Sequence, residues 1–270
     1  MQNKKRSEEL NHHIKVVQAL ASAVLEGGRG TAGTPFPKQP EKVLKLYEFE
    51  GSPFCRRVRE VLTTLNLDYE VYPCPKGGSK YRQIVQEKGG KLQFPFLIDE
   101  NTGDHLYESQ VIIDHLFKHY GQTGQTPKKY ATYPKIPYMA LAGTVVNGAR
   151  GIWIKKKIKD RAAPKQLLEL WGFEASPYTR VVRTELAELE IPFVFHNVAK
   201  ECWQDQGPAA LRLKPGKYVP VKGGKREQVV KQMNRDKQDI QVPYLVDPNT
   251  HVKMFESQAI VEYLRHQYGK

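Results

Sequence analysis

The sequence predicts an α/β protein built from two similar units in tandem, each with the element order βαβ, helix, ββα. Three observations predict it. The chain has 270 residues, which is enough for two domains with separate cores. Stretches of the first half return in the second half. Within each half, short β-prone stretches alternate with stretches of helical periodicity.

The internal repeat covers both ends of each unit. Its first part has an offset of 124 residues and its later parts an offset of 148, so the second copy contains an insertion of 24 residues, mostly at about 199–220. The matching pairs are 44–56 with 168–180, 94–99 with 242–247, and 107–110 with 255–258. Apolar stretches at 19–25 and 140–146, each followed by glycine, predict a short helix ahead of each unit.

The first unit begins with a β-prone strand over residues 43–49. A turn at Gly51 follows, and Ser52 and Pro53 suit the cap and the first position of a helix. One apolar stripe should pack that helix on a sheet: Val58, Val61, Leu62 and Leu65. A second strand at 68–72 should run parallel to the first, because a helix forms the crossover.

The rest of the unit comprises a helix, two strands and a final helix, predicted at about 81–88, 96–98, 105–107 and 108–119. Equivalent residues should form the core face of the last helix in both copies: Ile112, Ile113, Leu116 and Tyr120, then Ile260, Val261, Leu264 and Tyr268. This order is the thioredoxin arrangement. The predicted fold class is therefore two tandem thioredoxin-like (βαβ-α-ββα) domains with a helical pre-segment and a linker.

The predicted divisions are an N-terminal arm with a short helix at 1–41, a first domain at 42–121, a basic linker with a short helix at 122–165, and a second domain at 166–270. The net charge of +13 lies mainly in the linker, which has 10 Lys and Arg against one Asp, whereas the first domain has 11 of each sign. Residues 150–165 could thus contact an acidic protein or a membrane surface. A solvated connector is the alternative interpretation, and no nucleic-acid motif accompanies the charge.

Several classes of protein are excluded by composition. No apolar run reaches the length of a membrane span, and the start of the chain lacks a signal peptide, so we expect a soluble intracellular protein. Cys55, Cys74 and Cys202 form no CxxC pair, which argues against a disulfide framework or a zinc site. The histidines show no metal-ligand spacing either, and we expect no metal.

One motif lies where chemistry is expected. Residues 52–55, Ser-Pro-Phe-Cys, follow the first parallel strand, and ligands of α/β sheets gather beyond the carboxyl ends of such strands. Together with Phe94-Pro95 and Glu108-Ser109, this motif resembles glutathione transferases and glutaredoxins. The chain resembles in particular the plant and algal plastid proteins that carry two such N-terminal domains in tandem. The likeness covers roughly 42–121 and 166–269.

The resemblance implies a role for each matching residue. Ser52 would stand where a glutaredoxin has its nucleophilic cysteine, or where serine-type transferases have the hydroxyl that binds the glutathione thiolate, and Cys55 would keep the trailing thiol. Pro95 would be the cis-proline, with Phe94 offering its backbone to glutathione. Glu108 and Ser109 would hold the γ-glutamyl end. The matching positions in the second copy are Ser176, Val242, Pro243, Glu256 and Ser257.

The resemblance implies a glutathione-binding protein with weak glutathione transferase or thiol-redox activity, in the plastid stroma. Two departures leave enzyme activity open: neither copy has the leading cysteine, and no all-helical transferase domain of about 100 residues follows either copy. Ser52 and Ser176 could be helix caps alone. The alternative function is a non-catalytic adaptor that binds an acidic partner or a membrane surface through the basic linker.

Overall fold

The computed structural model describes residues 2–131, 138–155, 162–202, 205, 220–233 and 240–269. The first unit contains β1 (Leu44–Glu48), α2 (Pro53–Thr64), β2 (Tyr69–Pro73), α3 (Arg82–Gly89), β3 (Phe96–Asp99), β4 (Asp104–Leu106) and α4 (Ser109–Tyr120). The second contains β5 (Leu168–Gly172), α7 (Pro177–Glu188), β6 (Phe193–Asn197), α8 (Lys225–Gln232), β7 (Tyr244–Asp247), β8 (Val252–Phe255) and α9 (Ser257–Tyr268). Both follow the predicted order, so the predicted fold class is confirmed.

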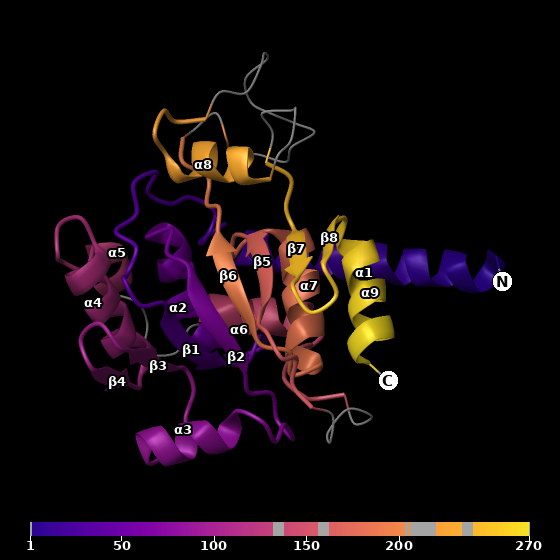
Figure 1. The fold of residues 1–270 in the computed structure, drawn as a ribbon, viewed down its shortest axis with the longest axis horizontal. Helices are drawn as coiled ribbons and strands as arrows, with labels where there is room; N and C mark the ends of the chain where they lie inside the picture. The colour runs from indigo at the N-terminus through magenta and orange to yellow at the C-terminus, as the bar shows by residue number, and fades with distance from the viewer. Residues whose placement is uncertain are drawn as a thin grey trace.

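The strands of both units form one continuous sheet. In the described residues this sheet has eight strands in the order β4-β3-β1-β2-β6-β5-β7-β8. The pairs β1–β2 and β5–β6 are parallel, as expected from their helical crossovers. The units join where β2 and β6 pair antiparallel, with Val71 opposite Phe193. The parallel strands of the two units therefore run in opposite directions, so their carboxyl ends lie at opposite ends of the sheet. The helices α3 and α8 lie at these two ends (Figure 1).

Helices cover both faces of the sheet. The predicted stripe of α2 and the predicted core faces of α4 and α9 are buried in one large cluster, with Leu44 and Leu46 of β1 and Leu168 and Leu170 of β5. On the other face, α3 packs over Tyr47 and Phe96, and α8 packs over Trp171. The alternation of Leu46 and Tyr47 between the two clusters is the period-2 pattern of a strand buried on both faces.

In the described part of the chain, three further helices lie outside the two units: α1 (Gln2–Leu25), α5 (Lys128–Ala131) and α6 (Tyr138–Val146). The helices α1 and α6 pack on each other, and Ser22 Oγ donates to the Gly143 carbonyl over 2.7 Å. Each also packs against the other unit, α1 on α7 and α6 on α2. The helix that precedes each unit in the sequence therefore packs against the other unit.

The segments after α1 and α6 make matching contacts with the opposite unit. The Gly30 carbonyl accepts from the Ala175 amide over 3.0 Å, and the Gly151 carbonyl accepts from the Gly51 amide over 3.4 Å. Gly30 and Gly151 are equivalent in the repeat, as are Ala175 and Gly51. The two hydrogen bonds are therefore related by the approximate twofold symmetry of the two copies.

The prediction of a short helix in the N-terminal arm was wrong, because α1 has 24 residues. The prediction used only the apolar stretch at 19–25, whereas the preceding residues contain neither glycine nor proline and extend the same helix. The inner face of α1 is small and buried, with Ala19, Ser22 and Ala23. The N-terminal part of α1 projects beyond α9 (Figure 1). Most of the predicted insertion at 199–220 lies outside the described residues, which include only 199–202, 205 and 220 of it.

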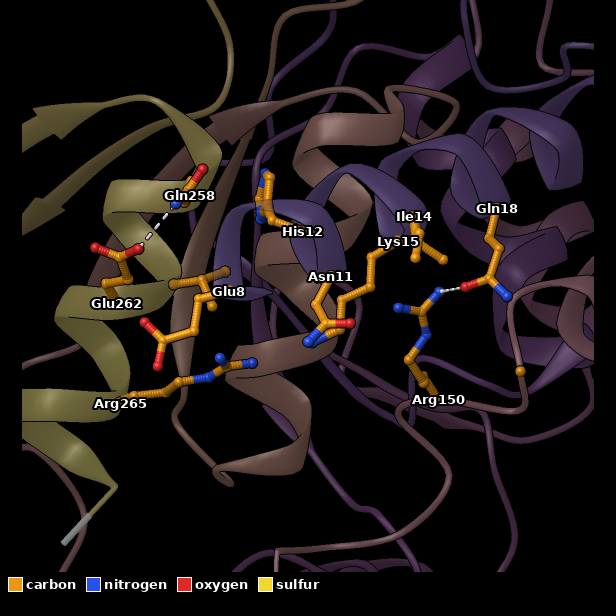
Figure 2. A pocket seen from close by; sticks show the side chains of 12 residues that line it. Glu8, Asn11, His12, Ile14, Lys15, Gln18, Arg150, Gln258, Glu262 and Arg265 are labelled. Carbon is orange, nitrogen blue, oxygen red and sulfur yellow. Dashed lines mark hydrogen bonds between the residues drawn. The ribbon is translucent and has the colours of Figure 1, made fainter. Parts of the chain in front are cut away.

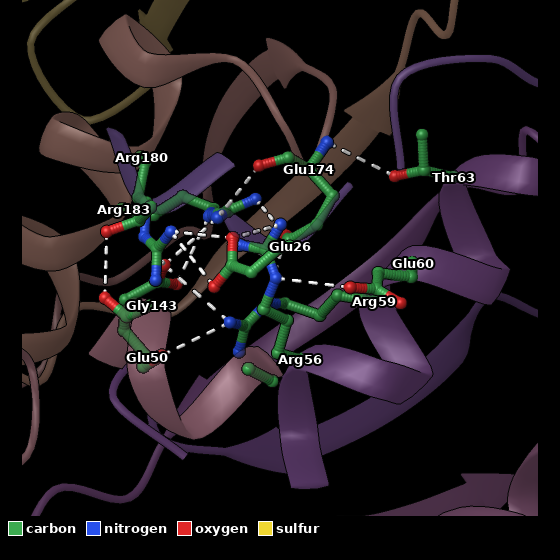
Figure 3. A network of polar contacts seen from close by, with 12 residues as sticks. Glu26, Glu50, Arg56, Arg59, Glu60, Thr63, Gly143, Glu174, Arg180 and Arg183 are labelled. Carbon is green, nitrogen blue, oxygen red and sulfur yellow. Dashed lines mark hydrogen bonds and ion pairs between the residues drawn. The ribbon is translucent and has the colours of Figure 1, made fainter. Parts of the chain in front are cut away.

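A cluster of buried charges lies between α2 and α7 (Figure 3). It contains Glu26, Glu48, Glu50, Arg56, Arg59, Glu60, Glu174, Arg180 and Arg183, all at most 4% exposed. Arg59 and Arg56 of the first unit bind Glu174 of the second, at 3.1 and 3.0 Å. Reciprocally, Arg183 binds Glu50 at 2.9 Å. Removing either carboxylate would leave arginines buried without a partner, which is costly.

Candidate functional site

The hydroxyl of Ser52 caps α2. Its Oγ accepts from the Cys55 amide over 3.3 Å, and the side chain is 2% exposed. Ser176 caps α7 in the same way, accepting from the Thr179 amide over 3.3 Å and from the Thr179 hydroxyl over 2.9 Å. The local sequence explains both turns, since a serine followed by proline stops the strand and begins a helix. Capping is thus a structural role of both serines.

The thiol of Cys55 is fully buried beneath this turn. Burial and the charge of Glu48 raise the pKa of Cys55 to about 12, against a smaller lowering by a hydrogen bond with Ser52. Cys74 follows β2 and is also fully buried, and burial raises the pKa of its thiol well above the ordinary value. Because the thiolate is the reactive form, both thiols are poor nucleophiles near neutral pH.

The peptide bonds before Pro95 and Pro243 are cis, the conformation that the resemblance implies for Pro95. Phe94 is partly buried, and the Arg82 guanidinium lies 4.9 Å from the centre of its ring. Among the described residues, the backbone N–H and C=O of Phe94 form no hydrogen bond. Next to Pro95, the chain therefore presents one donor and one acceptor that a bound peptide could use.

The pair Glu108-Ser109 lies at the start of α4. Glu108 is exposed, has a φ of 63°, and its carboxylate accepts from the side chain of Gln93. Ser109 is 5% exposed, and its Oγ accepts from Arg57 over 3.3 Å. Arg57 also donates to the Gln110 side chain over 2.7 Å. This end of the site therefore joins an exposed carboxylate, a hydroxyl and a buried guanidinium.

Arg57, Gln93 and Arg82 were not identified from the sequence. One signal could have found Arg57: the second copy has Val181 at the equivalent position, although both neighbouring arginines of α2 return as Arg180 and Arg183. A charged residue that departs from an otherwise repeated pattern marks a difference between the copies.

The corresponding site of the second unit has the same glutamate contact but a different partner for its serine. Glu256 has a φ of 69° and accepts from Gln241, as Glu108 does from Gln93. Ser257, however, is hydrogen-bonded to His12 of α1, with 3.0 Å between Nε2 and Oγ. The N-terminal helix therefore contacts the second copy at a serine that the resemblance implies for ligand binding.

The basic linker is partly folded against the second unit. Lys155 pairs with Glu185 and, at 3.5 Å, with Glu188, while its amide donates to the Glu188 carbonyl over 2.9 Å. Lys156 and Lys157 lie outside the described residues. Within the described ranges, no group of three or more His, Cys, Asp or Glu side chains could hold a metal ion, and no helix has the length and apolarity of a membrane span.

The amino-acid sequence matches the model of one protein family in two regions. The family described as Glutathione S-transferase, N-terminal domain, matches residues 46–124 and again residues 170–270. No curated protein and no solved structure matches the chain. The two matched regions cover most of the sequence and contain both serine caps, both cis-prolines and both Glu-Ser pairs. The chain therefore belongs to the glutathione S-transferase N-terminal domain family.

Proposed function

We propose that the first unit binds glutathione at the edge formed by Ser52, Phe94, Pro95, Glu108 and Ser109. The observation that carries this proposal is the unpaired backbone of Phe94, whose N–H and C=O can pair with the cysteinyl part of a peptide. Glu108 is exposed and carries the charge that an ammonium group requires. Ser109, held by Arg57, lies beside it and suits a carboxylate.

Ser52 is the residue in this proposal nearest to chemistry. A hydroxyl at the N-terminus of α2, where the helix dipole favours negative charge, suits the thiolate of glutathione. A ligand thiolate activated in this way would support weak transferase activity. The burial of Cys55 gives no support to a thiol-redox step through this residue.

The first unit is a better candidate than the second because of α1. In the second unit, His12 uses the hydroxyl of Ser257. The matched position in the first unit, Ser109, is bound by Arg57, a cation that would attract a ligand carboxylate. We therefore assign the stronger glutathione site to the first unit and keep Ser176, Val242, Pro243, Glu256 and Ser257 as a weaker site.

A glutathione titration followed by NMR tests the proposal. Saturable shifts should occur at the amides of Phe94 and Ser109, and Ser109→Ala should weaken binding about tenfold or more, because a charged group loses a hydrogen bond. The matched Ser257→Ala variant should bind as the wild type does. Absence of saturable shifts at millimolar glutathione, or equal loss in both variants, would contradict the assignment to the first unit.

An adaptor role through the basic linker is the second candidate function. The ion pairs of Lys155 show which lysines of the linker a test should change. Lys155 already pairs with Glu185 and Glu188, so the lysines to neutralise are Lys156 and Lys157. Salt-sensitive association with vesicles of anionic lipid or with an acidic peptide, lost in the Lys156→Gln/Lys157→Gln variant, would support it. A plastid location remains a prediction from the resemblance.

A further inference from the structure

A cavity of about 430 Å³ lies between α1 and α9, beside the loop that follows α6 (Figure 2). Its lining from α9 consists of Gln258, Val261, Glu262 and Arg265, which share one face of the helix at helical spacing. Neither Ser52, Phe94 nor Ser109 lines it. The α1–α9 cavity is therefore separate from the glutathione site proposed for the first unit.

Two cations in the α1–α9 cavity have no ion-pair partner in the described part of the chain. Lys15 is partly buried and forms no hydrogen bond or ion pair there. Arg150 donates only to neutral groups, at 2.7 Å to Gln18 Oε1 and at 2.8 and 3.0 Å to Asn147. Burial lowers the pKa of both groups, although Glu188 raises that of Arg150; for Lys15 the charges of Arg265 and Arg150 lower the pKa further, while that of Glu185 raises it. Positive charge of this kind favours an anion.

The nearby acids act on these two cations only at longer range, because their close ion pairs are with other cations. Glu185 accepts two hydrogen bonds from Arg265, at 3.0 and 2.8 Å, and also binds Lys155. Glu188 binds Lys155 at 3.5 Å and accepts from the Gly151 amide over 3.1 Å. Glu185 and Glu188 thus form their ion pairs with Lys155 and Arg265, and neither lies within ion-pair distance of Lys15 or Arg150.

The side of the α1–α9 cavity next to α9 carries two carboxylates together with Arg265, whose charge is paired with Glu185. Glu8 and Glu262 are exposed and line it, and Glu262 accepts from the Gln258 side chain over 3.0 Å. In Figure 2 these two carboxylates lie toward α9, whereas Arg150 lies on the far side. Ile14 and Val261 add apolar lining between charged groups. The cavity therefore has a basic side and an acidic side with apolar surface available to a carbon chain.

We propose that the α1–α9 cavity binds a small amino acid-like zwitterion, with its carboxylate between Lys15 and Arg150 and its ammonium group toward Glu8 and Glu262. A planar guanidinium matches the geometry of a carboxylate, and an ammonium group suits exposed carboxylates. A phosphate dianion suits the cavity less well, because Glu8 and Glu262 would repel it.

The test uses the full chain, glutamate as the probe, and NMR at constant ionic strength. Saturable shifts should occur at the Gly148 amide and the Gln258 side chain, both of which line the cavity. Lys15→Gln should weaken glutamate binding about tenfold or more, and Glu262→Gln should weaken it as well. Lys118→Gln removes the charge of an exposed lysine on α4, away from the cavity, and should leave the affinity unchanged.

Three results would overturn the proposal. The first is the absence of saturable shifts at millimolar glutamate, and the second is equal binding by the wild type and Lys15→Gln. The third is binding of glutarate or inorganic phosphate as tight as that of glutamate, since glutarate lacks the ammonium group and phosphate lacks the carbon chain. Because Lys15 forms no polar contact among the described residues, its replacement should leave the fold intact, which a thermal unfolding curve verifies.

Discussion

Arg59 and Glu174 form an ion pair of 3.1 Å between residues 115 positions apart, and neither side chain is exposed. The repeat-related pair, Arg183 and Glu50, forms the equivalent contact at 2.9 Å. Each unit therefore supplies a carboxylate to the arginine of its partner unit. This reciprocity makes the relative position of the two units specific, because any other arrangement would leave these charges buried without partners.

The first prediction is that Glu174→Gln destabilises the protein strongly. Glu174 contacts Arg56, Arg59 and Arg183, so its loss leaves three buried guanidinium groups short of negative charge. We expect the free energy of unfolding in urea to fall by about 3–5 kcal/mol. Glu87→Gln, an exposed change on α3, should alter it by less than about 1 kcal/mol. Similar values for the two variants would show that the buried ion cluster contributes little.

The second prediction concerns pH and Glu60. Burial raises the pKa of Glu60 from 4.5 to about 7, despite its contact with Arg56 at 3.2 Å. The folded protein thus binds this proton more tightly than the unfolded chain. The resulting stability is fully present below pH 4.5 and is lost as the pH rises through about 7.

Measurement of urea unfolding between about pH 5 and about pH 7 checks this, with an effect of at most about 1.4 kcal/mol per pH unit from one group. Glu60→Gln should make the unfolding free energy depend less on pH in this range, whereas Glu87→Gln should not. An unchanged slope in Glu60→Gln would contradict the raised pKa. Glu174 titrates at lower pH, because Arg183 and the other arginines lower its pKa to about 2, whereas burial raises the pKa of Glu48 to about 7, so part of the slope should remain in Glu60→Gln.

The third prediction is that Gly30→Ala and Gly151→Ala destabilise the protein to a similar extent. A Cβ at Gly30 would lie 2.6 Å from the Cβ of Glu174, and one at Gly151 would lie 2.7 Å from the Cβ of Glu50. Both glycines also have a positive φ. We expect losses of about 1–3 kcal/mol from the close contact, in addition to the cost of the backbone conformation.

Gly90→Ala is the matched control, because Gly90 has a φ of 77° and open space around its Cβ position. It isolates the cost of the backbone conformation. Thermal or urea unfolding should show a larger loss for Gly30→Ala and Gly151→Ala than for Gly90→Ala. Equal losses in the three variants would mean that the segments around Gly30 and Gly151 shift to accommodate a Cβ at little cost.

The fourth prediction is that acid loosens α1 through His12. Burial and the neighbouring charge of His13 lower the pKa of His12 below 6.5. Protonation of His12 therefore favours the undocked helix, and this stability is lost as the pH falls through 6.5 toward the folded value. Hydrogen exchange of α1, corrected with α4 as a reference, should accelerate as the pH falls below 6.5.

His12→Ala should remove the contact with Ser257, so exchange in the first turn of α9 should be faster at neutral pH and less dependent on acid. His13→Ala provides the comparison, since His13 is exposed and bonds only the Glu9 carbonyl of its own helix. If both variants exchange alike, the hydrogen bond between His12 and Ser257 does not hold α1 in place.

The sequence predicted the elements well because their signals are local. The serine at position 52, the proline after it and the stripe from Val58 to Leu65 fix the turn and the helix, and the structure confirms them. The repeat then transferred the same elements to the second copy. The spacing of apolar residues predicts which face of each helix packs on the sheet, and the predicted faces of α2, α4 and α9 are buried.

The relationship between the units could not be predicted in this way. Arg56 and Arg59 lie outside the apolar stripe of α2, yet both are buried, because Glu174 of the second unit binds them there. The pairing of β2 with β6 could not be predicted from the sequence of either strand. The hydrophobic pattern of such a strand is the same whether it lies at the edge of a sheet or inside it. The contact of His12 with Ser257 joins residues 245 positions apart and likewise has no local signature.

The pairing of β2 with β6 also determines what happens when the chain is divided. A fragment of residues 42–121 would carry β2 as an open edge, together with the arginines that Glu174 now neutralises. Open edges of this kind recruit further strands. Two such fragments can join β2 to β2 in the antiparallel sense that β6 satisfies here, so the isolated half should behave as a self-associating species whose size depends on concentration.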